Sequence, residues 1–219
     1  MTRGYASVGG STRTRRRRPT RAAGRAPAAV ISERPLTVVS DSARPPSDRY
    51  TVTPMEQPEG VTGRALVVVV DDRRARGVEE DSSGPLVTEL LGEAGFVVDG
   101  VVVVSADEAE ILKALNTAII GGVDLVISVG GTGVTPRDVA PEATRTILDR
   151  ELPGIAEALR ASGVAAGSTE AGLSRGLAGI SGSTLVVNLA DSRAAVRDGM
   201  ATLGPMAAHV ITELSSLEI

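Results

Sequence analysis

The chain has 219 residues, 42% of them hydrophobic, and a formal net charge of −4, which is enough apolar material for one substantial core. The absence of cysteine and the single histidine exclude disulfides, thiolate metal sites, a cysteine nucleophile and a His-rich metal site. One Phe, two Tyr and no Trp predict an aliphatic core, and with no membrane-length apolar run and no secretory signal we expect a cytoplasmic protein.

The first 54 residues differ in charge from the rest of the chain. They hold 11 arginines against three acidic residues, whereas residues 55–219 hold 12 basic against 24 acidic residues. Because this Arg/Pro-rich segment shows no sustained period, we predict a disordered tail over 1–54 and one domain over 55–219. The run Arg15–Arg18 could contact nucleic acid, an acidic lipid surface or a protein, or the tail could have no partner. Met55 is an alternative native start.

The first part of the domain alternates apolar runs with a helical pattern. ALVVVV over 65–70 predicts a buried strand that ends at Asp71 and Asp72. PLVTELLGEAG predicts a helix that stops at Gly95, and FVVDGVVVV predicts a second strand that ends at Ser105.

The alternation continues toward the C-terminus. Asp107 or Ser105 can cap the next helix, which ends at a Gly-Gly pair and whose apolar stripe is Ile111, Leu112, Leu115 and Ile119. DLVISV and STLVVNL predict two more strands, and Pro205 is expected to kink or restart the last helix. This series predicts an α/β fold, a three-layer sandwich with a mostly parallel central sheet flanked by helices.

The stretch GGTGVTPRD, residues 130–138, follows the third predicted strand. Ligands of parallel sheets gather at the carboxyl ends of the strands. Gly130, Gly131 and Gly133 permit positive φ and close approach of the backbone, so their N–H groups can form an anion cradle to which Thr132 adds a hydroxyl. The stretch is neither a Walker loop nor a dinucleotide fingerprint. The alternative is a simple tight turn between strand and helix.

Carboxylates follow several of the predicted strands. Asp138, beside Arg137, can position Mg²⁺ or accept a proton, or it can pair locally with Arg137 or cap a helix at Pro141. In a parallel sheet, the acids after the other strands converge on the same rim: Asp71, Asp72 and Asp107. Glycine amides and carboxylates together fit magnesium-assisted chemistry on a phosphorylated ligand.

Two stretches carry a family resemblance. SVGGTGVTPRDVAPEATRTILDRELPGIAEALR and the following LSRGLAGISGSTLVVNL resemble the molybdenum-cofactor biosynthesis family of the Mog and MoaB type, which has the fold of the gephyrin cofactor-binding domain. The resemblance covers roughly residues 63–215. It implies a homo-oligomer, a trimer or dimer of trimers, that binds molybdopterin at the glycine loop. In the Mog branch it also implies transfer of AMP from Mg-ATP to molybdopterin.

The resemblance also implies site residues. Asp107 and Asp138 are the expected catalytic residues and the expected ligands of Mg²⁺, while Asp81 and Gly84 match the acid and glycine that open the family's first helix. The expected ligand-binding residues are Gly130, Gly131, Thr132, Gly133, Asp72, Asn188 and Ser192.

The chain departs from the family pattern at three positions. Asp191 stands in the place of the glycine of a Leu-Pro-Gly-Ser-Pro turn, where its charge could repel phosphate or cap the next helix. Ala140 replaces a common threonine, which as an alanine N-cap would cost about 1 kcal/mol, and Ser128 also stands where threonine is common. Three functions stay open: adenylyl transfer to molybdopterin, pterin carriage without chemistry, and a regulatory scaffold that has lost turnover.

Overall fold

In the computed structural model, which describes residues 61–216, six strands form one sheet in the order β2-β1-β3-β6-β5-β4. The pairs β2–β1, β1–β3 and β3–β6 are parallel, while β5 and β4 complete the sheet as antiparallel neighbours. The predicted mostly parallel sheet is confirmed, and the predicted tail over 1–54 lies outside the described residues. The strands are β1 (Gly63–Val70), β2 (Phe96–Val104), β3 (Leu125–Val129), β4 (Arg150–Glu151), β5 (Ala178–Ser181) and β6 (Thr184–Leu189).

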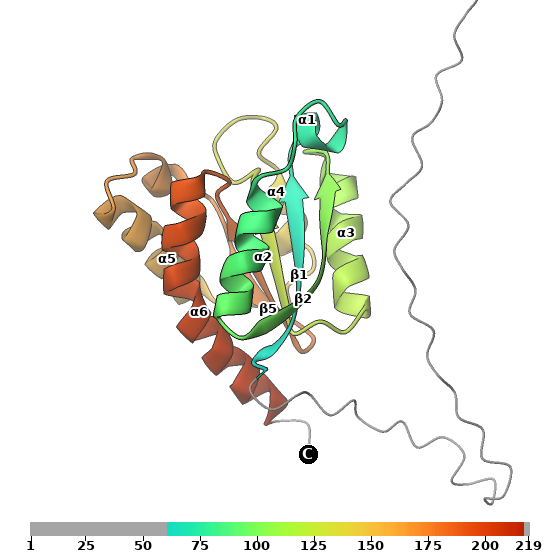
Figure 1. Ribbon diagram of the computed structural model, residues 1–219, viewed down its shortest axis with the longest axis vertical. Coiled ribbons are helices and arrows are strands. Elements are labelled where there is room, and N and C mark those ends of the chain that lie inside the picture. The colour runs from blue at the N-terminus through green and yellow to red at the C-terminus, as the bar shows by residue number, and fades with distance from the viewer. Residues whose placement is uncertain (1–60, 217–219) are drawn as a thin grey trace, which may run out of the picture. The chain divides into compact units, whose positions relative to one another are not determined.

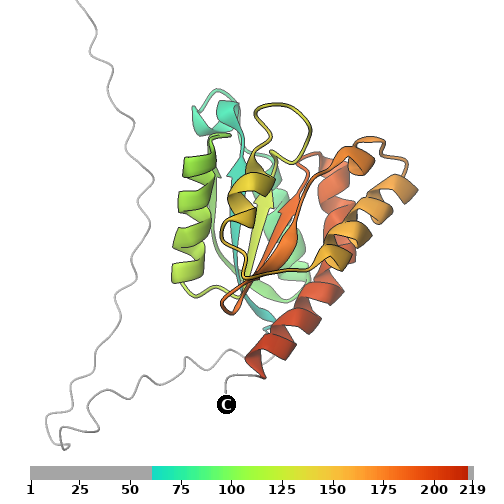
Figure 2. The same cartoon turned by 180° about the vertical axis from the view of Figure 1, so that it is seen from behind.

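Helices cover both faces of the sheet. In Figure 1, α2 and α6 lie in front of the strands, and the view from behind in Figure 2 shows α3 and α4 on the other face. Within residues 61–216, no helix is long and apolar enough to cross a membrane. The helices are α1 (Asp72–Ala75), α2 (Ser83–Glu93), α3 (Glu108–Ile120), α4 (Ala140–Arg145), α5 (Pro153–Ala165), the 3₁₀ helix η2 (Glu170–Leu173) and α6 (Arg193–Ser215).

The core explains why the strands are continuous apolar runs. Successive side chains of a strand point to opposite faces of the sheet. Accordingly, Val67 and Val69 pack in one cluster with residues of α2 and α6, including Leu91 and Leu203. Residues 68 and 70 pack in a second cluster with the Ile111 and Leu115 stripe of α3. Because both faces are buried, neither can carry the polar half of an alternating pattern.

Local signals predicted the helix ends with mixed success. Asp107 caps α3, its carboxylate accepting hydrogen bonds at 3.1 Å from the amides of Ala109 and Glu110. The helix α6 runs through Pro205 without restarting, so that part of the prediction was wrong. Leu203 and Ala207, on either side of the proline, are both fully buried, and this packing holds the helix together where the proline lacks an N–H.

The helix α4 begins differently from both predictions. Its N-cap is Val139, which has no side-chain capping bond, so neither Asp138 nor Ala140 caps it. Ala140 is instead the first helical residue, fully buried, and its N–H donates to the carbonyl of Gly131 at 3.1 Å. The helix thus starts by packing on the glycine-rich loop, and the expected loss of an N-cap does not arise.

Candidate functional site

The parallel strands end in register at one edge of the sheet. Val70 is paired with Val104, and Val129 is paired with both Val69 and Leu189. The connections after β1, β2, β3 and β6 therefore start at the same rim. In Figures 1 and 2, α1 and the loop that follows β3 stand together above the tips of these strands. The predicted convergence of strand-end loops is confirmed.

Two glycines are required in the loop over residues 130–138. Gly130 has φ +99° and Gly131 has φ +64°, which other residues rarely adopt. A Cβ at Gly130 would lie 2.5 Å from the carbonyl oxygen of Val70, and one at Gly131 would lie 3.3 Å from the Cβ of Ala140. The backbone of this loop therefore lies directly against β1 and α4, where a side chain does not fit.

The carbonyls of this loop point toward the protein. The oxygen of Gly131 accepts from the amide of Ala140 at 3.1 Å, that of Thr132 from the amide of Arg175 at 2.8 Å, and that of Gly133 from the Nε of Arg175 at 2.7 Å. In a planar trans peptide the N–H of the next residue points the opposite way. Among residues 61–216, the amides of Thr132 and Val134 donate to no protein acceptor. They are the amides best placed to bind an anion.

Asp138 holds the loop closed from its far end. Its carboxylate accepts from the amide of Thr135 at 2.8 Å, and a Cβ at Gly133 would lie 2.9 Å from it. Burial raises the pKa of Asp138, but hydrogen bonds from Thr135 and Gly133 and the charge of Arg175 outweigh it and lower the pKa overall. Asp138 therefore remains ionised, and its carboxylate accepts hydrogen bonds from the loop itself.

Arg137 pairs with Asp72, which lies 65 positions earlier, so the local Arg137–Asp138 pair was a wrong prediction. The Nε of Arg137 lies 3.0 Å from Oδ2 of Asp72, and its Nη2 lies 2.6 Å from Oδ1. Oδ1 also accepts from the amide of Ala106 at 3.1 Å. The hydrogen bond from Arg137 is the main cause of the lowered pKa of Asp72. One carboxylate thus joins the loop, α1 and the β2–α3 connection.

The larger of two hollows at this rim measures about 380 Å³, a volume within the usual range of small-molecule pockets, about 300–1,000 Å³. It brings together Asp72, Asp107 and Arg137, but not Asp138; Ala75, Arg76, Ser105 and Glu110 complete the lining. In the described part of the chain, no three acidic or histidine side chains form a ready metal site. Protein-bound Mg²⁺ commonly takes one or two carboxylates together with phosphates and water, and Asp107 fits that role, whereas both oxygens of Asp72 accept from Arg137.

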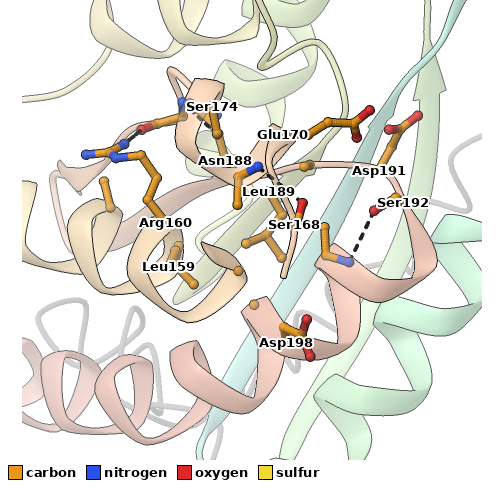
Figure 3. A pocket seen from close by; sticks show the side chains of 17 residues that line it. Leu159, Arg160, Ser168, Glu170, Ser174, Asn188, Leu189, Asp191, Ser192 and Asp198 are labelled. Carbon is orange, nitrogen blue, oxygen red and sulfur yellow. Dashed lines mark hydrogen bonds between the residues drawn. The ribbon is translucent and has the colours of Figure 1, made fainter. Parts of the chain in front are cut away.

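The smaller hollow, about 70 Å³, lies between α5, η2 and the turn that leads from β6 into α6 (Figure 3). Ser192 lines it and caps α6, its Oγ accepting from the amide of Ala195 at 3.2 Å. The capping alternative for Asp191 is therefore wrong. Arg160 is the basic residue of the described lining, whose acidic residues are Glu170, Asp191 and Asp198. Asp191 thus adds negative charge to this hollow. It also lies beside the glycine loop, because a Cβ added at Gly130 would lie 3.6 Å from the Cβ of Asp191.

Asn188 lines the same hollow, but its side chain is bonded within the protein. Its Nδ2 donates to Oγ of Ser128 at 2.6 Å and to Oγ1 of Thr144 at 2.8 Å. Its Oδ1 accepts from the amide of Leu177 at 3.0 Å, and the residue is only 3% exposed. Asn188 therefore ties β6 to β3, to α4 and to Leu177, which precedes β5. A direct contact with a ligand stays a prediction.

Sequence reasoning gave no role to two groups that support the rim. Arg175 contacts the glycine loop at several points, although the family motif LSRGLAG contains it. Ser83 donates to the carbonyl of Asp191 at 3.3 Å and accepts from Nη1 of Arg74 at 3.1 Å, which ties α1 and α2 to the turn after β6. The motif marked Arg175, but only the folded chain shows what it contacts.

An α/β sheet with a glycine loop between two hollows at its carboxyl edge defines a small-molecule-binding protein of the open-sheet type. Residues 66–209 match the family described as "Probable molybdopterin binding domain". The chain belongs to this molybdopterin-binding family of molybdenum cofactor biosynthesis, which confirms the predicted resemblance.

Individual relatives agree with this assignment. A crystal structure of a molybdopterin biosynthesis protein from Mycobacterium abscessus is 76% identical, covers 72% of this chain and 99% of its own, and superposes with a TM-score of 0.70. The molybdopterin adenylyltransferase of Pyrococcus furiosus is 35% identical over 149 residues, which are 66% of this chain and 87% of that protein.

Other relatives are longer than this chain. It is 33% identical to the Drosophila melanogaster molybdenum cofactor synthesis protein cinnamon, but the match spans 66% of this chain and 24% of cinnamon. It spans about half of two bifunctional molybdenum cofactor biosynthesis proteins, 48% of that of Chlorobaculum tepidum and 54% of that of Synechococcus elongatus.

Proposed function

We propose that the protein binds molybdopterin at the rim of its sheet and adenylylates it with Mg-ATP. The observation that carries the proposal is the orientation of the glycine loop. Its carbonyls accept hydrogen bonds from Ala140 and Arg175, and its amides at Thr132 and Val134, which donate to no acceptor within residues 61–216, can donate to an anion. Arg137 of the loop lines the larger hollow, and Gly130 of the loop lies beside Asp191, which lines the smaller one. The similarity of this chain to the molybdopterin adenylyltransferase of Pyrococcus furiosus, which covers 87% of that protein, supports the same activity.

The proposed reaction joins the two ligands at phosphorus. An oxygen of the terminal phosphate of molybdopterin attacks the α-phosphorus of ATP, a new P–O bond forms, and the bond to the β-phosphate breaks to release pyrophosphate. Adenylylated molybdopterin and pyrophosphate are the products. Preorganised amides of the loop would orient the attacking phosphate, while charge develops on the oxygens of the α-phosphate and of the departing pyrophosphate.

Mg²⁺ would neutralise charge on the phosphates of ATP, and this chain offers it Asp107 in the larger hollow, where Asp72 binds Arg137. Asp138 was the second expected magnesium ligand. Its carboxylate lies against the amides of Thr135 and Gly133, and we propose that it acts on the reaction by holding the loop. Arg137, held by Asp72 at the same rim, can contact a phosphate through the guanidinium edge that Asp72 leaves open.

Two substitutions at Asp107 separate its capping role from its proposed role toward Mg-ATP. An asparagine side chain can still cap the helix, so Asp107→Asn should change the free energy of unfolding by no more than about 0.5 kcal/mol, whereas Asp107→Ala should lower it by about 1 kcal/mol. Both should abolish adenylylation if the carboxylate serves the metal. Urea unfolding and a product assay measure the two effects, and an active Asp107→Asn protein would remove Asp107 from the reaction.

A second function is favoured by the acidic smaller hollow. Asp191, Glu170 and Asp198 surround a site where the family has a neutral turn, which would weaken phosphate binding and leave a scaffold or pterin carrier without turnover. In that case the basic segment 1–54 is the candidate contact for a nucleic acid or protein partner.

One titration tests both functions. Purified protein is titrated with molybdopterin, Mg²⁺ and ATP, and the products are analysed for adenylylated molybdopterin and pyrophosphate. We expect binding in the micromolar range and AMP transfer; the absence of any binding at such concentrations contradicts the proposal. Binding without transfer supports carriage. The same measurement on Asp191→Gly should show tighter molybdopterin binding. AMP transfer that occurs only in this variant identifies Asp191 as the cause of inactivity in the wild-type protein.

The partner hypothesis needs a separate comparison. DNA and protein binding of the full chain is compared with that of a chain beginning at Met55. Unchanged binding together with robust adenylylation argues against a regulatory role for the segment 1–54. Light scattering of the same samples tests the proposed trimer.

A further inference from the structure

Arg175 lies between η2 and β5 and reaches across to the glycine loop. Each nitrogen of its guanidinium group has a different acceptor. Nε donates to the carbonyl of Gly133 at 2.7 Å, Nη2 donates to the carbonyl of Asp138, and Nη1 donates to Oε1 of Glu142 on α4. Its own backbone amide donates to the carbonyl of Thr132 at 2.8 Å. One residue therefore binds both ends of the loop and the helix that follows it.

These contacts set the direction of the peptide planes in the loop. Since C=O and N–H are antiparallel in a trans peptide, holding the carbonyl of Gly133 turns the amide of Val134 away from Arg175. The amide of Gly133, in the plane whose carbonyl the Arg175 amide binds, donates to Asp138. A glycine-rich backbone has little stiffness of its own and would otherwise sample both plane orientations. The interaction with Arg175 therefore selects the orientation that presents the N–H of Val134 for anion binding.

Glu142 completes the arrangement from the first turn of α4. The hydrogen bond from Arg175 is the main cause of its lowered pKa, so the pair is ionised on both sides. The second carboxylate oxygen of Glu142 is buried and has no hydrogen-bond partner in the described part of the chain. Glu142 thus orients the guanidinium group, and Arg175 is the group that touches the loop.

We propose that Arg175 is a positioning residue for the proposed reaction: it acts by holding the peptide planes of the glycine loop so that the amide of Val134 faces the anion. This role rests on the proposed function for the identity of that anion. The effect on the loop itself does not depend on any ligand. A lysine cannot replace Arg175, because a single ammonium group cannot reach three acceptors arranged around a planar fork.

Hydrogen exchange without ligand gives the direct test. In Arg175→Lys, amide exchange in a peptide over residues 128–139 should speed up by about tenfold or more, because this loop opens more often. Arg145→Lys is the matched control, since Arg145 lies on α4, as Glu142 does, and pairs with Glu151 through an exposed contact at 3.2 Å without touching the loop. Equal loop exchange in the two variants would overturn the proposal.

Chemical rescue distinguishes positioning from general support of the fold. In Arg175→Ala, millimolar guanidinium should restore slow loop exchange and micromolar molybdopterin binding, whereas a merely destabilised protein is left unchanged by so little guanidinium. Failure of rescue in a folded variant contradicts the proposal. If wild-type protein binds no molybdopterin but Arg175→Lys still loosens the loop, the proposed function fails while the control of the loop by Arg175 stands.

Discussion

Gly130→Ala is expected to lower the free energy of unfolding by about 2–5 kcal/mol and to abolish ligand binding at the rim. Two effects add at this position. The backbone has φ +99°, which is costly for alanine, and the new Cβ would lie 2.5 Å from the backbone oxygen of Val70. This oxygen belongs to the backbone of the last residue of β1, so it cannot move aside as the end of a flexible side chain could. Urea unfolding followed by circular dichroism measures the loss.

Gly122→Ala is the matched control for the steric part of this effect. Gly122 has φ +69°, but an added Cβ there would have no neighbour within 4 Å. This variant should lose only about 1–2 kcal/mol, the cost of the left-handed conformation. If the two alanine variants were equally stable, the close approach of the loop to β1 would not constrain it.

Asn188→Asp should lower the free energy of unfolding by about 3 kcal/mol or more at pH 7. The change removes the two N–H donors that bind Ser128 and Thr144 and leaves a buried carboxylate facing their hydroxyls. Burial raises the pKa of the new carboxyl in the folded state above its unfolded value. The variant is therefore closest to wild type at acidic pH and loses stability as pH rises through the folded pKa.

The measurement is the difference in unfolding free energy between variant and wild type at pH 5 and pH 8. Asn116→Asp provides the control, because the same chemical change occurs at an exposed position of α3. This control should change stability by no more than about 0.5 kcal/mol at either pH. A pH-independent loss at position 188 would show that the carboxylate there is solvated.

The order and type of the main elements followed from local patterns. Continuous apolar runs predicted β1, β3 and β6, because a strand buried on both faces has no room for polar side chains. An apolar run also predicted β2, although it lies at the edge of the sheet and Val97 and Val101 are exposed. Asp107 was predicted as a helix cap, and its carboxylate needs only amides two and three positions later. The glycine loop was also placed at the correct edge, since its position depends only on which strand it follows.

Contacts between distant segments were not predictable in this way. The sequence offered Arg137 a local pair with its neighbour Asp138, whereas the fold places it beside Asp72 by ending β1 and β3 side by side. Similarly, Asp138 looked like a metal ligand or a cap, whereas the turn of the loop directs its carboxylate to Thr135 and Gly133.

The residues alone were sufficient to establish an α/β sheet with a flexible, glycine-rich connection at its ligand-binding edge. They could not say which way the peptide planes of that connection face. Those planes are held by Arg175, which follows Gly133 by 42 positions in the sequence and lies just before β5, the strand that pairs with β6. A peptide plane can turn over with little change in local geometry, so its direction is decided by the distant donor that binds its carbonyl.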